Sequence, residues 1–171
     1  MRKSLGILAI VVVTVLATLA VVNVMRDDNS TNNDSAQSNN TENTSTSGKK
    51  ADYSNRGLKE IPKEALKDTS ITELDVSGNE LTGALPAEIK NLTKLEILNV
   101  SNNTMTGIPA EIGQLKNLKV LNYANNDITG LPYELGNLEK IESIDFSGNA
   151  VSEQDLDIIL EKLNRTIEVI L

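Results

Sequence analysis

The sequence predicts an α/β solenoid of stacked repeats, and the first observation behind this prediction is a fixed period. Four asparagines fall 24, 23 and 23 residues apart, and four prolines keep the same step. The repeated positions are Asn79, Asn103, Asn126 and Asn149, with Pro62, Pro86, Pro109 and Pro132. A period in the twenties is typical of units that bury their apolar faces only against their neighbours.

The second observation is the apolar pattern inside each unit. It runs apolar-x-x-apolar-x-apolar-x-x-Asn-x-apolar, which in one unit is Leu95, Leu98, Val100, Asn103 and Met105. The alternation at Leu98 and Val100 is the period of two expected of a short strand with one inward face. The asparagine side chain both donates and accepts hydrogen bonds, so the repeated asparagines are expected to form a structural ladder where each strand bends.

This pattern resembles that of the leucine-rich repeat family. Residues 107–115 and 130–138 are similar to its 23–24-residue subclasses, whereas the extra residue Ala84 resembles the form common in plant receptor ectodomains. The units without this insertion resemble bacterial and intracellular members. The resemblance covers about residues 52–171. It implies a right-handed solenoid with a short parallel β-sheet on its concave face and short helical or extended turns on its convex face.

The N-terminal residues 1–26 are predicted to be a signal anchor. Residues 5–25 are 21 residues with three polar interruptions, long enough to cross a bilayer. Arg2 and Lys3 precede the span, which places the N-terminus in the cytoplasm and the repeats outside, in a single-pass membrane protein. The alternative is a signal peptide cleaved near Ala20, which would release a secreted protein.

Three further regions follow the predicted anchor. Residues 27–50 are rich in Asn, Ser and Thr, too polar to bury a core, and are expected to be a disordered linker. The repeat domain is expected at residues 51–171. It divides into an N-terminal cap at about 51–70, repeats at about 71–94, 95–117, 118–140 and 141–163, and a C-terminal cap at about 152–171.

Both caps depart from the repeat pattern. Arg56 takes the ladder position in the first cap. In the second, Ser152 and Asp155 resemble a capping box that opens an amphipathic helix. A last short strand is expected in residues 166–171, with Ile167 and Ile170 pointing inward.

Composition limits the classes of function. The chain has no Cys and no His, which excludes disulfides, thiolate metal sites and histidine bases. Three of its 16 bases and none of its 24 acids lie in residues 1–26, so residues 27–171 carry 13 bases against 24 acids. That acidic excess argues against nucleic acid and anionic lipid headgroups as partners of the repeats.

The sequence predicts no catalytic residue, no cofactor and no metal site, and therefore a protein that is not an enzyme. Asp75 and Asp145 would stand about 14 Å apart, too far to act on one bond. The two asparagines between them fall short of the ligand count that Ca²⁺ requires.

The candidate ligand-binding residues are the strand positions that point away from the core. Ile97 and Val120 form an apolar pair in a polar field, which is how small protein-binding patches are built; two ordinary surface residues are the alternative. Tyr133, on the convex side, is a further interaction candidate. The predicted binding set is Glu73, Asp75, Ile97, Asn99, Val120, Asn122, Ser143 and Asp145.

The predicted function is a non-catalytic recognition module, tethered to a membrane through residues 5–25 or secreted, that binds a protein or polymer through the concave face. The alternative is a structural surface protein that self-associates through its terminal strand, because residues 167–171 would leave an open apolar edge.

Overall fold

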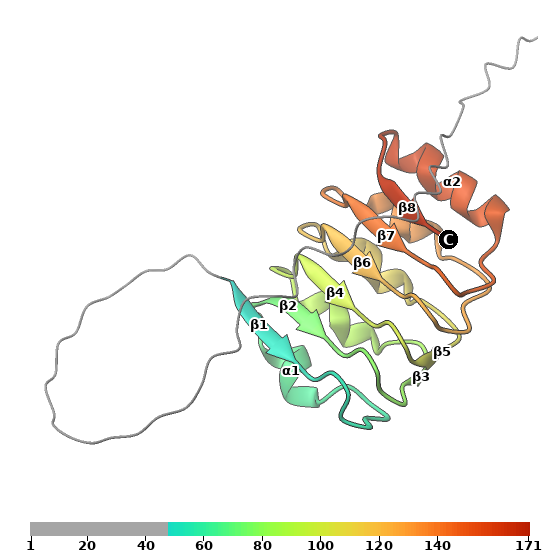
Figure 1. The fold of residues 1–171 in the computed structure, drawn as a ribbon. Helices are drawn as coiled ribbons and strands as arrows, with labels where there is room; N and C mark the ends of the chain where they lie inside the picture. Colours follow the sequence, from blue (N-terminus) through green and yellow to red (C-terminus); the bar gives the residue numbers. More distant parts are fainter. Residues whose placement is uncertain (1–47) are drawn as a thin grey trace, which may run out of the picture. The chain divides into compact units, whose positions relative to one another are not determined.

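The computed structural model describes residues 48–171 (Figure 1). The predicted anchor at residues 1–26 lies outside the described residues, and so does the linker as far as residue 47. Within residues 48–171, no helix is both long and apolar enough to cross a membrane.

A parallel sheet of six strands runs through the described residues, with the strands side by side in chain order (Figure 1). The parallel pairing that the family resemblance implied is therefore present. The strands are β1 (Lys49–Asp52), β2 (Ile71–Asp75), β4 (Ile97–Asn99), β6 (Val120–Asn122), β7 (Ser143–Asp145) and β8 (Glu168–Ile170).

The strands form because each has at least one residue that points into the core. Leu74, Leu98, Leu121 and Ile144 lie beside one another in the sheet, and each is fully buried. Burial of one such side chain stabilises the fold by about 2 kcal/mol. The repeat pattern therefore aligns the strands, since any other register would expose this row.

Short helices cover the other side of the core (Figure 1). A proline precedes all but the last of them; proline fixes φ and lacks an N–H, so it suits a turn into a helix. The helices are α1 (Lys63–Lys67), the 3₁₀ turns η1 (Ala87–Asn91), η2 (Ala110–Gln114) and η3 (Tyr133–Asn137), and α2 (Glu153–Leu163).

A second, two-stranded parallel sheet was not predicted. It pairs β3 (Thr82–Gly83) with β5 (Thr104–Met105) where the chain crosses from the large sheet towards the helices. Gly83 has a φ of 69°, a left-handed conformation that glycine adopts without strain.

The boundary predicted for the linker is wrong by two residues, because β1 begins at Lys49. Composition did not reveal this, since Lys49 and Lys50 are as polar as the linker. What orders them is pairing: Lys49 contacts Asp68, and Lys50 forms an ion pair with Glu73 at 2.6 Å.

The inward orientation predicted for Ile170 is also wrong. Val169 pairs with the buried Ile144, whereas Ile170 pairs with Asp145 on the opposite face and is 39% exposed. The terminal residues are nearly all apolar, so their pattern does not distinguish the two faces, and pairing with β7 decides. Ile167 does pack against the core.

Helix α2 begins with half of the predicted capping box. The Ser152 hydroxyl accepts a hydrogen bond from the Asp155 N–H at 3.2 Å. The Asp155 carboxylate does not return the bond to Ser152. It accepts from the Leu131 N–H at 3.2 Å and so ties α2 to the preceding unit.

Candidate functional site

The face of the large sheet opposite the helices, here called the open face, corresponds to the predicted concave surface. All eight predicted binding residues lie on it and are partly exposed. Strand pairing sorts them into two rows. One row, here called the outer row, lies two residues before the ends of the strands and consists of Glu73, Ile97, Val120 and Ser143. The other, here called the Asx row because these four residues are aspartates and asparagines, consists of the last strand residues Asp75, Asn99, Asn122 and Asp145.

Both rows extend further than the sequence predicted. Strand β1 adds Lys50 to the outer row and Asp52 to the Asx row. Strand β8 adds Glu168 and Ile170 to the same two rows. Asp52 aligns with Asp75 in the repeat pattern, and this alignment already indicated that residues 50–52 extend the two rows. No comparable signal marked β8, where the register was misread.

The Asx row has a structural role that sequence reasoning missed. Each side-chain Oδ1 accepts a hydrogen bond from the backbone N–H two residues further on, an Asx turn that ends the strand. The N···O distances are 2.9 Å at Asp75, 3.1 Å at Asn99, 2.9 Å at Asn122 and 2.8 Å at Asp145. The recurring Asp/Asn-x-Ser at strand ends could have revealed these turns.

The turns leave the second polar atom of each Asx side chain for other contacts. Asn99 Nδ2 donates to Asp75 Oδ2 at 3.0 Å, so these two side chains are locked together. A ligand on this row would therefore meet pre-positioned oxygens and amides, which lose little conformational entropy on binding.

The repeated asparagines form hydrogen bonds both within their own unit and to the preceding one. Asn126 Nδ2 contacts the carbonyls of Tyr123, Ala124 and Val100, and its Oδ1 accepts from the Met105 N–H at 2.9 Å. Comparable bonds are made by Asn79, Asn103 and Asn149. Asn103 and Asn126 are buried beneath the sheet and are not available to a ligand.

The centre of the open face is apolar and its surroundings are acidic. Ile97 and Val120 lie directly beside each other on β4 and β6. The two bases near them are engaged: Lys50 pairs with Glu73, and Lys119 pairs with Glu96 at 2.7 Å. The hydrogen bond to Glu96 also raises the pKa of Lys119, so this base stays charged. Further acids lie on the same face or at its strand ends, at Asp52, Asp75, Glu142, Asp145 and Glu168.

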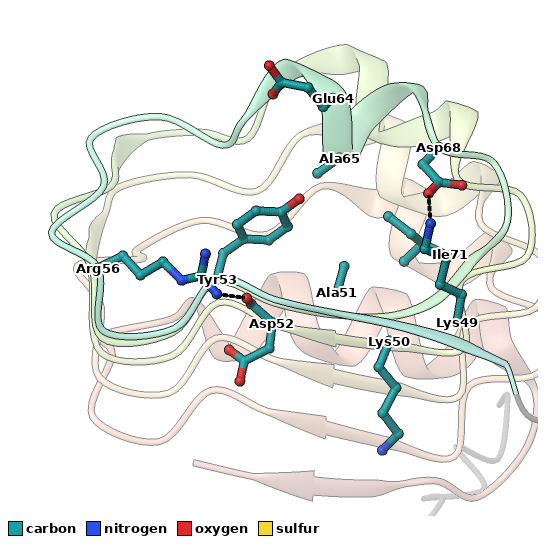
Figure 2. Close-up of a pocket in the computed structure, with 10 residues that line it drawn as sticks. All are labelled: Lys49, Lys50, Ala51, Asp52, Tyr53, Arg56, Glu64, Ala65, Asp68 and Ile71. Atoms are coloured by element: carbon teal, nitrogen blue, oxygen red, sulfur yellow. Dashed lines mark hydrogen bonds and ion pairs between the residues drawn. The ribbon is translucent and has the colours of Figure 1, made fainter. Parts of the chain in front are cut away.

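Two hollows open beside the sheet and on the helical side of the described residues. One of about 320 Å³ opens at the N-terminal end, between β1 and α1 (Figure 2). Another of about 710 Å³ lies on the helical side, with Leu66, Leu81 and Leu85 in its lining.

Tyr133, the remaining predicted interaction candidate, is separated from the open face. Tyr133 begins η3 on the helical side and is 50% exposed, with its hydroxyl 3.4 Å from Asp155 Oδ1. Asp75 and Asp145 are held apart by β4 and β6. Among residues 48–171 no three His, Cys, Asp or Glu side chains gather closely enough to hold a metal ion.

Comparison with known proteins supplies independent information. Models described as leucine rich repeat match residues 93–151 and residues 70–92. No curated protein matches the chain. Among solved structures, a leucine-rich repeat protein of Leptospira interrogans is 36% identical, with a TM-score of 0.60, over 65% of this chain and 28% of its own.

Two plant receptors are also similar. The leucine-rich repeat ectodomain of the Arabidopsis thaliana membrane receptor kinase GASSHO1/SCHENGEN3, in complex with CASPARIAN STRIP INTEGRITY FACTOR 2, is 28% identical over 65% of this chain and 13% of its own, with a TM-score of 0.53. A plant peptide hormone receptor in complex with RGF2 is 32% identical over 64% of this chain and 18% of its own, with a TM-score of 0.54. The chain thus spans less than a third of the length of these structures.

Proposed function

The chain belongs to the leucine-rich repeat family, and from this premise we propose that residues 48–171 are a non-catalytic recognition module that binds a protein ligand on the open face. The observation that carries the proposal is the arrangement of that face. An apolar pair, Ile97 and Val120, lies at its centre within a rim of fixed polar groups. Protein interfaces combine an apolar centre with a polar rim in this way.

The size and charge of the face limit the ligand. Six strands at the usual spacing make a surface about 25 Å wide, enough for one small interface of standard size. The acidic surplus around the apolar pair favours a ligand with basic residues, which the field of the face would steer towards it. The two plant receptors described above were solved in complex with CASPARIAN STRIP INTEGRITY FACTOR 2 and with RGF2, which supports a protein or peptide as the ligand here.

The location of the module is part of the same proposal. Residues 5–25 would hold it at a membrane with the repeats outside, or would be removed to release a secreted form. An external location agrees with the similarity to a receptor ectodomain.

The test is a pull-down from envelope and medium fractions with the full-length chain as bait. The test variant carries Ile97→Glu and Val120→Lys, two changes on partly exposed residues that leave the buried row intact. Tyr133→Ser is the comparison variant, since it alters the competing interaction candidate, an exposed side chain on the helical side. We expect one partner to be retained by the wild type and the comparison variant and lost by the test variant.

Retention of the same proteins by wild type and test variant would contradict binding on the open face. Retention of nothing but further copies of the chain would favour the structural alternative, in which the protein self-associates.

A further inference from the structure

The two ends of the large sheet are open edges within the described residues. β1 pairs with β2 alone, and β8 pairs with β7 alone. An edge strand presents a row of backbone N–H and C=O groups that can pair with another strand. Because the sheet is parallel, a strand added at either edge in the same direction would simply continue it.

The residues on the two edges are complementary in the register that the sheet already uses. Lys50 and Glu168 both belong to the outer row, and Ala51 and Val169 are both inward positions. A junction in which β8 of one copy lies beside β1 of the next would place Glu168 beside Lys50. It would also place Val169 beside Ala51, so that Lys50 would lie between Glu73 and the Glu168 of the next copy while an apolar contact forms beneath them.

The third position of this junction would pair Ile170 with Asp52. The same combination already exists within the chain, where Ile170 pairs with Asp145 on β7. Asp52 and Asp145 form the same turn, since each accepts a hydrogen bond from the N–H of the serine two residues further on. The chain's last internal pairing is therefore a template for the junction.

Shape supports the same pairing. The hollow at the N-terminal end lies between β1 and α1, and Figure 2 shows Ala51, Tyr53 and Ala65 around it. The hollow exposes the end of the core at the place where another repeat would stack if one came before β1. The opposite end carries apolar side chains that are only partly covered: Leu160, Leu163 and Val169 pack against the core but are not fully buried, and Leu171 is 55% exposed.

We propose that copies of this chain stack head to tail, with β8 of one copy pairing in parallel with β1 of the next. The contact joins two different surfaces of the molecule, so it is heterologous and extends as a linear assembly unless a rotation closes it. The open face would become continuous across copies, which would present several ligand sites together. The proposal does not depend on the identity of a ligand or on the function proposed for the open face.

The test is the association state of the full-length chain, measured by sedimentation velocity in an uncharged detergent from about 1 µM to about 1 mM, the range expected of a small interface. We expect the wild type to form dimers and longer species as concentration rises. Lys50→Glu and Glu168→Lys each place like charges at the junction and should weaken association about tenfold or more.

Mixing the two variants gives the decisive result. In the mixture, the acid that Lys50→Glu places on its β1 edge meets the base that Glu168→Lys places on its β8 edge. The mixture should therefore associate more strongly than either variant alone. Lys94→Glu is the matched control, an exposed charge inversion away from both ends, and should associate like the wild type. Ile170→Asp provides a second variant on β8, the edge that also carries Glu168. Circular dichroism establishes that each variant is folded.

Three results would overturn the proposal. A wild type that stays monomeric across the range would do so; a crosslink from residues 1–47 into the hollow would then identify the chain's own N-terminal segment as its occupant. Association that neither inversion weakens would point to contacts elsewhere, such as residues 5–25. A mixture that associates no better than its components would show that Lys50 and Glu168 do not meet.

Discussion

At the scale of the residue, similar side chains on the two sides of each strand end have different roles. The ladder asparagines below the sheet join neighbouring units, as Asn103 does through Val76 and Val100. The Asx row on the open face closes turns within one unit and leaves the second polar atom of each side chain outside the turn, where that of Asn99 bonds to that of Asp75. The repeat pattern indicated both sets of residues, but only the ladder was predicted to be structural. The role of the Asx row was missed because it depends on a local hydrogen bond to the N–H two residues further on.

The buried Tyr123 leads to a prediction. Its hydroxyl is fully buried and, among the described residues, has no hydrogen-bond partner, and burial alone raises the pKa of the phenol far above its ordinary value. Phe146 occupies the same inward position in the next unit. Tyr123→Phe should therefore increase the free energy of unfolding by about 1 kcal/mol, since it removes an unsatisfied polar group.

Urea unfolding followed by circular dichroism would measure this change. Tyr133→Phe is the control, because its hydroxyl is on the surface, and should leave the free energy of unfolding nearly unchanged. A loss of stability in Tyr123→Phe would mean that the hydroxyl has a partner, such as an enclosed water.

At the scale of the element, close stacking of the 3₁₀ turns gives a second prediction. A Cβ on Gly113 of η2 would lie 2.2 Å from the backbone oxygen of Glu134 in η3. Because η3 is itself packed against α2, it cannot move away freely. Gly113→Ala should therefore lower the free energy of unfolding by about 2 to 3 kcal/mol.

Gly107 supplies the comparison for this substitution. The nearest atom to a Cβ at that position is the Ala84 Cβ at 3.8 Å, an ordinary van der Waals contact. Gly107→Ala should thus be neutral or slightly stabilising. Equal thermal shifts in the two variants would show that the turns are not held at the observed spacing.

A third prediction concerns the attachment of β1. The hydrogen bond from Lys49, followed by those from Ser70, lowers the pKa of Asp68 from 3.8 to about 2. A lowered folded-state pKa means that the stabilisation is present above the unfolded value of 3.8 and is lost as the pH falls towards 2. Part of the acid-induced loss of stability should therefore come from this one carboxylate.

Denaturant unfolding at a series of pH values between 2 and 5 would test the assignment. Asp68→Asn should flatten the pH dependence in this window, whereas Asp127→Asn, an exposed carboxylate away from β1, should keep it. An unchanged slope in Asp68→Asn would mean that Asp68 does not stabilise the folded state through these contacts.

At the scale of the whole molecule, the sequence predicted the interior of the solenoid better than its ends. Interior strands have a neighbour on each side, and a single register buries residues such as Leu98 and Leu121. The first and last strands have one neighbour each, so the polar residues before Ala51 and the mostly apolar residues 167–171 were compatible with more than one arrangement. The small β3–β5 sheet was missed because two-residue strands leave no periodic signal.

The same asymmetry predicts a gradient of local stability. Each interior unit shares its core and its ladder bonds with two neighbours, so opening it breaks two interfaces, whereas opening an end unit breaks one. Amide hydrogen exchange at low protein concentration should therefore be slowest in β4 and β6 and fastest in β1 and β8. Uniform protection along the sheet would instead indicate that the whole domain opens only as one unit.

Concentration then distinguishes an end that is merely frayed from one that serves as an interface. If copies stack head to tail, exchange in β1 and β8 should slow together as the concentration rises, while exchange in β4 and β6 stays constant. The glutamate variant at Lys50 should remove this dependence from both strands at once, although β8 lies at the opposite end of the chain's sheet. A change confined to β1 would show that the substitution acts only locally, through the lost pair with Glu73.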